Sequence, residues 1–290
     1  METTKLVTLK GVEEGFIPLL QAAQPKLRSI AVDGLVNQTS DQVFKALREV
    51  MDTDPDPSIK DKAAMALSKA KDPKIAAAAL FHTLRSTDIK VAVQAAEKLI
   101  KTKSKEADEE LLKAVMRTEV QIRSAAINTL VLRKTITPLV KLLNGELGIE
   151  VKVEIAKAIR DQKKARKSAY KFLVTQPNGE AASEAINSLK GEKLKGDVAS
   201  WFESALRHPD ASTRVTVASQ LTQFKGSSAL KVLATADIDD EKSGEEVHKA
   251  MRSIYNKMSD KVILNDCARE SSVSLKSAAT GVLGHLYQRA

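Results

Sequence analysis

The stretch DPSIKDKAAMAL, residues 56–67, decides the fold, because its pattern recurs along the chain at a nearly constant interval. Sliding this twelve-residue window along the sequence finds comparable windows starting near residues 24, 88, 119, 148, 178, 210, 243 and 272. With residue 56 included, the successive starts are 32, 32, 31, 29, 30, 32, 33 and 29 residues apart. The twelfth position is Leu or Ile in all nine windows, and the eighth is Ala in seven. Such self-similarity is the signature of a repeat protein.

Each window predicts a helix, because its apolar positions 4, 8 and 12 fall on one helical face. A second amphipathic helix precedes it in the repeat, as in DQVFKALREVM, residues 41–51. We call the preceding helix the A helix and the helix of the window the B helix. One helix pair cannot bury its apolar faces alone, whereas stacked pairs can. The sequence therefore predicts an all-α protein, a right-handed α-solenoid of about nine helix pairs forming a single domain over residues 1–290.

The windows resemble the HEAT-repeat family, especially the short bacterial HEAT-like repeats that also occur in phycobilin lyase subunits. The family carries a basic residue at the fifth position of the B helix. Here that position is basic in six windows, at Arg28, Lys60, Arg123, Lys152, Arg214 and Lys276. The resemblance implies that these residues tie successive repeats together as a ladder. It also implies that A helices line a convex surface and B helices a concave one.

The composition bounds the possible functions. The 290 residues include 43% hydrophobic and 29% charged residues, with a net charge of +9, which is typical of a soluble, folded chain. The single cysteine, Cys267, excludes an intrachain disulfide, and the four histidines lie in different repeats without metal-ligand spacing. The longest apolar run, residues 75–81, is too short to span a membrane, and the N-terminus lacks a signal-peptide pattern. We expect a cytoplasmic protein without a metal, a cofactor or a catalytic constellation.

The basic run RDQKKARKSAYK, residues 160–171, is a candidate anion-binding surface. In the repeat register it covers the turn after a B helix and the next A helix, which starts near Lys164. The resemblance places it on the convex side, where it forms a basic ridge. We define the basic ridge as Lys163, Lys164, Arg166, Lys167 and Lys171.

Positions 3, 7 and 10 of the B helices are expected to face the concave side. A groove that follows a phosphate backbone needs Lys and Arg along its length and aromatic side chains for stacking bases. These positions are instead mixed, and in the fifth and sixth windows they form an acidic patch of Glu150, Glu154, Glu180 and Glu184. This pattern disfavours nucleic acid on the B helices and predicts docking of a basic helix or peptide.

A run of acids, DIDDEKSGEE at residues 237–246, fails the calcium-binding EF-hand loop, because Lys242 stands where the loop requires glycine. We expect it to stabilise a helix N-terminus. The sequence thus favours a non-enzymatic scaffold or adaptor of a bacterial cell that binds another protein on its concave face. Two alternatives remain. One is a nucleic-acid-binding HEAT-like protein, either DNA glycosylase-like or using the basic ridge; the other is a phycobilin-lyase-like subunit.

Overall fold

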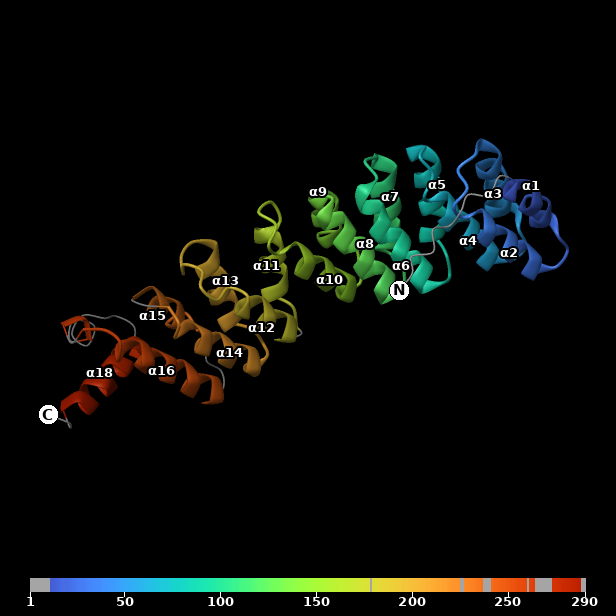
Figure 1. Ribbon diagram of the computed structural model, residues 1–290. Helices are drawn as coiled ribbons and strands as arrows, with labels where there is room; N and C mark the ends of the chain where they lie inside the picture. Colours follow the sequence, from blue (N-terminus) through green and yellow to red (C-terminus); the bar gives the residue numbers. More distant parts are fainter. Residues whose placement is uncertain are drawn as a thin grey trace, which may run out of the picture. The chain divides into compact units, whose positions relative to one another are not determined.

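The computed structural model describes residues 11–177, 179–224, 227–236, 241–259, 261–263 and 273–287. Within these ranges every regular element is a helix, which confirms the predicted all-α fold built of helical repeats (Figure 1). The chain divides into two compact units, residues 1–139 and 140–290, and each is described by itself. The division falls within helix α9 (Ile136–Leu143).

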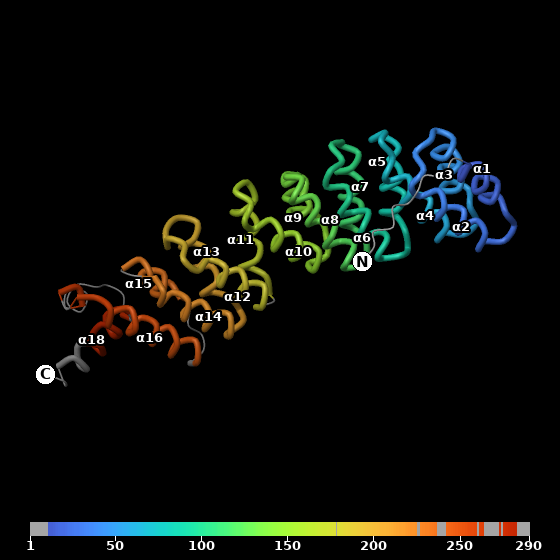
Figure 2. The backbone as a smooth tube through the Cα atoms, viewed as in Figure 1, coloured from blue at the N-terminus to red at the C-terminus, as the bar shows by residue number. Residues whose placement is uncertain are grey.

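Unit 1 consists of stacked helix pairs. Its elements are α1 (Val12–Phe16), η1 (Pro18–Gln21), α2 (Pro25–Leu35), α3 (Asp41–Thr53), α4 (Pro57–Leu67), α5 (Pro73–Leu84), α6 (Ile89–Lys98), η2 (Leu99–Lys101), α7 (Lys105–Ala114) and α8 (Val120–Leu132), where η denotes a 3-10 helix. The B helices α2, α4, α6 and α8 form one layer, and the A helices α3, α5 and α7 form the other (Figures 1 and 2).

Unit 2 repeats the same arrangement. Its elements are α10 (Ile149–Ile159), α11 (Arg166–Val174), α12 (Gly179–Asn187), α13 (Asp197–Leu206), α14 (Ala211–Leu221), α15 (Ser227–Leu233), α16 (Glu241–Tyr255) and α18 (Val273–Tyr287). The B helices are α10, α12, α14, α16 and α18, and the A helices α11, α13 and α15 lie between the first four of them along the chain. The two layers are therefore present in both units.

The predicted B-helix starts agree with the structure. Eight of the nine B helices begin one residue after the predicted start, and α16 begins two residues before it. Aspartates account for several starts, since Asp56 and Asp88 accept hydrogen bonds from backbone N–H groups of the first turn, as helix N-caps do. The A helix predicted from Lys164 starts instead at Arg166, after a turn. The repeat register was thus predictable almost to the residue.

The core follows the periodic stripe. In unit 1 the alanines at the eighth position, Ala31, Ala63, Ala95 and Ala126, are completely buried. The leucines at the twelfth position are equally inaccessible, with at most 1% exposure. A small side chain at the crossing lets neighbouring helices approach, and the leucine fills the space beside it. This packing needs few aromatic residues, in keeping with an aromatic content of 3%.

The basic residues at the fifth position make hydrogen bonds both within their own repeat and to the next repeat. The Arg28 guanidinium donates to the carbonyls of Ala22 and Ala23, which close the turn before its own helix. It also pairs with Asp54 of the following repeat at 2.8 Å. Arg214 does the same in unit 2: it binds the carbonyl of Pro209 and donates from Nε to Ser243 of the next repeat. The ladder implied by the resemblance is confirmed at these two positions.

Candidate functional site

The basic ridge divides into two groups in unit 2. Arg166 pairs with Glu192 at 3.0 Å, and its guanidinium lies 5.3 Å from the ring centre of Tyr170 and 5.7 Å from that of Trp201. Lys167 pairs with Asp197, the first residue of α13, at 3.0 Å. These two cations therefore hold α11 against the following repeat.

The other three ridge residues, Lys163, Lys164 and Lys171, are exposed. Lys163 and Lys164 lie in the turn before α11, and Lys171 lies in its last turn, where a cation interacts favourably with the helix dipole. The continuous run of the sequence thus presents fewer available charges than its composition suggests.

Contacts between repeats likewise reduce the available charge of the acidic patch. Glu184 of α12 pairs with Lys157 at 2.5 Å and with Arg160 at 2.9 Å, both in the preceding repeat. These hydrogen bonds, that of Lys157 first, lower the pKa of the Glu184 carboxyl despite its partial burial. Glu150 and Glu180 are exposed, and Glu154 is half-buried. The charge of Glu184 is therefore already balanced within the protein.

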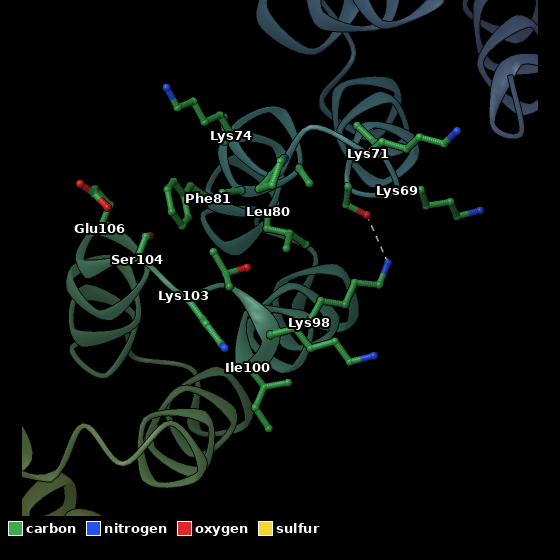
Figure 3. A pocket seen from close by; sticks show the side chains of 18 of the residues that line it. Lys69, Lys71, Lys74, Leu80, Phe81, Lys98, Ile100, Lys103, Ser104 and Glu106 are labelled. Carbon is green, nitrogen blue, oxygen red and sulfur yellow. Dashed lines mark hydrogen bonds between the residues drawn. The ribbon is translucent and has the colours of Figure 1, made fainter. Parts of the chain in front are cut away.

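A pocket of about 1240 Å³ lies in unit 1, among the end of α4, helix α5, the end of α6 and the start of α7 (Figure 3). Six lysines line it, against two acidic residues, Glu97 and Glu106. We call it the lysine pocket and define its lysines as Lys69, Lys71, Lys74, Lys98, Lys101 and Lys103.

The floor of the lysine pocket is apolar. Alanines of α5 line it together with the buried Leu80 and the half-buried Phe81. Ile100, in the 3-10 helix η2 that follows α6, is 38% exposed and also contributes. In Figure 3, Leu80 and Phe81 occupy the centre, and the labelled lysines surround them. The pocket therefore combines an apolar base with a cationic rim.

Burial and neighbouring positive charge act on Lys98 in the lysine pocket. Partial burial, and to a smaller extent the ammonium of Lys69, lower the pKa of Lys98. Lys98 donates to the hydroxyl of Ser68 at 3.4 Å, a contact drawn in Figure 3. Among the residues that the structure describes, the other five pocket lysines make no side-chain hydrogen bond or ion pair.

Arg133, at the end of α8, holds one wall of the pocket in place. Its guanidinium donates to the carbonyls of Leu99 and Ser104, at 2.7 and 3.1 Å, and to that of Thr102. It also pairs with Asp108 of α7 at 2.7 Å. The turn that presents Lys101 and Lys103 is therefore fixed from the next repeat.

The helical periodicity of the sequence does not reveal the lysine pocket, because its lysines lie at helix ends and in the turns between helices. A signal was nevertheless present. Lys69 and Lys101 occupy the fourteenth position counted from their window starts, and Lys71 and Lys103 occupy the sixteenth. Only these two consecutive repeats carry lysine at both positions.

A second surface of unit 1 is apolar and lies on the B layer. The first residues of its four B helices are Pro25, Pro57, Ile89 and Val120, and all four are exposed. Val120 is 53% exposed and Ile89 38%. Because they occupy equivalent positions in stacked repeats, we call these four residues the apolar row.

His208 is buried and hydrogen-bonded. His208 is 2% exposed; its Nδ1 accepts from the backbone N–H of Asp210, and its Nε2 lies 2.5 Å from the carbonyl oxygen of Gln176. Burial lowers the pKa of His82. The described part of the chain contains no group of three or more His, Cys, Asp or Glu residues suited to a metal ion. Cys267 and residues 237–240 lie outside the described residues.

Comparison with known proteins places the chain among helical-repeat proteins. A family model of HEAT repeats matches residues 13–88, so the resemblance to HEAT repeats is confirmed. A comparison with curated proteins finds no match. Among solved structures, the chain is similar to human deoxyhypusine hydroxylase in complex with glycerol, with 16% identity over 96% of each chain and a TM-score of 0.33. That score is too low to support a functional comparison. None of the described helices has the length and apolar character needed to cross a membrane.

Proposed function

We propose that this protein is a non-enzymatic scaffold or adaptor that binds another protein through its B layer. The observation that carries the proposal is the apolar row. Ile89 and Val120 expose β-branched aliphatic side chains at equivalent positions of α6 and α8, which pack against each other. Exposed aliphatic side chains at equivalent positions of neighbouring repeats are a candidate protein-interaction surface. Pro25 and Pro57 are explained by the preference for proline at the first helical position. Ile89 and Val120 are not explained in this way, since polar residues suit the first turn equally well.

The acidic patch on α10 and α12 of unit 2 is a second candidate surface, for a basic helix or peptide. Glu150 contributes an exposed carboxylate, whereas Glu184 is neutralised by Lys157 and Arg160. Charge reversal at Glu150 is therefore the sharper test, because Glu154, Glu180 and Glu184 each make an interaction within the protein that a reversal would also disrupt. Unchanged affinity for the captured partner in Glu150→Lys would remove the acidic patch from the proposal.

Affinity capture from native lysate tests the scaffold function. The tagged protein is used with and without nuclease, at about 50 and 200 mM salt, a range in which binding through phosphate contacts falls steeply. We expect a discrete protein that survives both treatments and is lost with the variant Ile89→Asp/Val120→Asp. The control variant Gln42→Asp/Lys105→Gln changes the net charge equally at exposed A-helix positions and should retain the partner.

Recovery of nucleic acid alone, lost at the higher salt, would contradict the proposal. It would favour the nucleic-acid alternative and direct attention to Lys163, Lys164 and Lys171 of the basic ridge. Capture of the same protein by the wild type and by Ile89→Asp/Val120→Asp in equal amounts would exclude the apolar row as the binding surface.

A further inference from the structure

The charges of the lysine pocket differ from the other cations of unit 1. Several arginines of unit 1 serve the packing of repeats: Arg28 pairs with Asp54, Arg85 with Glu110 and Arg133 with Asp108. Five of the six pocket lysines have no such partner among the described residues. Packing of the repeats therefore does not account for this concentration of positive charge.

Helix dipoles do not account for it either. A cation is stabilised near a helix C-terminus, which suits Lys69 and Lys98 at the ends of α4 and α6. Lys74, in contrast, lies in the first turn of α5, and Lys103 directly precedes Ser104, the N-cap of α7. At both places the dipole disfavours a positive charge. These two lysines do not stabilise the helices beside them. An anionic ligand is the simplest partner that would compensate their positive charge.

The floor of the pocket restricts the chemistry of that ligand. Phe81 and Ile100 offer apolar surface between the lysines, and Leu80 lies beneath it. A phosphate backbone would leave this floor uncovered. A ligand that alternates carboxylates with aliphatic or aromatic side chains would cover the floor and neutralise the rim together.

We propose that the lysine pocket binds an acidic segment of a partner protein, with its apolar side chains against Phe81 and Ile100 and its carboxylates on the surrounding lysines. The inference rests on the proposed scaffold function and names the chemistry of one partner segment. The pocket lies among α4, α5, α6 and α7, and none of its lining residues belongs to the apolar row. The two surfaces can therefore be tested separately.

Fluorescence anisotropy on the full chain provides the test. The probe is a labelled synthetic peptide in which Glu and Asp alternate with Leu and Phe. A polyglutamate peptide of equal charge and a single-stranded oligonucleotide of similar length serve as comparisons. We expect the amphipathic acidic peptide to bind most tightly at about 0.1 M salt, where charges within a Debye length of about 10 Å still interact.

Variants assign the binding to the pocket. Lys71→Glu/Lys103→Glu should weaken binding of the peptide by at least about tenfold, because each reversal removes an attraction and adds a repulsion. Lys163→Glu/Lys164→Glu is the matched control, since it changes the net charge equally at exposed turn positions of unit 2 and should leave the affinity unchanged. Ile100→Ser, at a position 38% exposed, should weaken binding of the amphipathic peptide but not of polyglutamate.

Four results would overturn the inference. Equal affinity for polyglutamate and the amphipathic peptide would remove the apolar floor from recognition. Tighter binding of the oligonucleotide, lost in Lys71→Glu/Lys103→Glu, would make the pocket a nucleic-acid site. Equal weakening by both double reversals, or no binding of the peptide, would exclude the pocket. Partner capture that persists in such a case, and still depends on Ile89 and Val120, would leave the proposed function standing.

Discussion

The pair of Arg28 and Asp54 allows a quantitative test of how the repeats hold together. The two side chains are 9% and 2% exposed, and the guanidinium donates to both carboxylate oxygens, at 2.8 and 3.1 Å. The same carboxylate accepts the backbone N–H of Asp56 at 2.8 Å, at the start of α4. Asp54→Ala would therefore leave a buried guanidinium without its carboxylate and free a backbone donor.

Removing one partner of a buried ion pair costs about 3–5 kcal/mol. Arg28 keeps the carbonyls of Ala22 and Ala23 as acceptors, so we expect Asp54→Ala to lose about 3 kcal/mol of unfolding free energy, at the low end of that range. Asp52→Ala is the matched control two residues away. It breaks only the Arg48–Asp52 contact, at 3.9 Å with both side chains more than half exposed, and should cost less than about 0.5 kcal/mol.

Urea unfolding followed by two signals measures the effect. Far-ultraviolet circular dichroism reports all helices, whereas fluorescence of the single tryptophan, Trp201, reports unit 2. Because interactions in repeat proteins act mainly between neighbours, Asp54→Ala should shift the circular dichroism transition more than the fluorescence transition. Equal urea midpoints for Asp54→Ala and Asp52→Ala would refute the conclusion that the ladder of basic residues stabilises the repeats.

The pH dependence gives a second check on the same pair. Burial alone would raise the pKa of Asp54, but hydrogen bonds from Arg28 and from the backbone of Asp56, together with the positive charge of Arg28, outweigh it and lower the pKa. A lowered pKa means that the unfolded chain binds the proton first. The stabilisation is therefore present at neutral pH and is lost as the pH falls through the acidic range, where the wild type should approach the stability of Asp54→Ala.

Three further predictions concern other parts of the chain. In unit 2, the Cβ added by Gly179→Ala would overlap the Asp210 carboxylate and the Thr213 hydroxyl, so we expect urea unfolding to show a loss of about 1–3 kcal/mol of unfolding free energy. In the control Gly148→Ala the added Cβ meets no atom within 4 Å, and the unfolding free energy should stay within about 1 kcal/mol of the wild type. Hydrogen bonds from Ser212 and Thr213 lower the pKa of Asp210 to about 2, so the stability that the Asp210 carboxylate contributes should be lost as the pH falls from about 4 to about 2. Urea unfolding followed by Trp201 fluorescence at a series of pH values should show a smaller loss of stability over this range in Asp210→Asn than in the wild type. In unit 1, Arg133→Ala should weaken binding of the acidic amphipathic peptide by loosening the turn at residues 102–104, and unchanged affinity would show that this turn needs no support.

The sequence predicted the fold well, because one short-range pattern repeats. Position 8 is alanine in seven of the nine windows and position 12 is Leu or Ile in all nine, so the helix starts follow from local residue types. The starts of α2, α4, α6 and α8 each lie one residue after the predicted value. The N-terminal boundary of α11 was less accurate, since residues 161–165 form a turn although their composition is compatible with a helix.

The candidate sites were predicted less completely, because they depend on distances between repeats. Nothing in the local sequence shows that Glu184 reaches Lys157 and Arg160, or that Arg166 reaches Glu192. The lysine pocket needs two turns, about 32 residues apart in sequence, to lie on either side of α5. The equivalent repeat positions of Lys71 and Lys103 could have indicated the pocket. The partial exposure of Phe81, in contrast, could not be predicted from the sequence.

Site-specific photo-crosslinking tests the central claim, protein binding through the B layer, most directly. A photoreactive phenylalanine analogue is placed at Val120 in the apolar row and, as a control, at the exposed Glu109 on A helix α7. Both proteins are irradiated in native lysate, and the crosslinked products are identified by mass spectrometry. The account predicts one discrete protein crosslinked from Val120 and absent from Glu109. Crosslinks from Glu109 alone, or to nucleic acid alone, would contradict it.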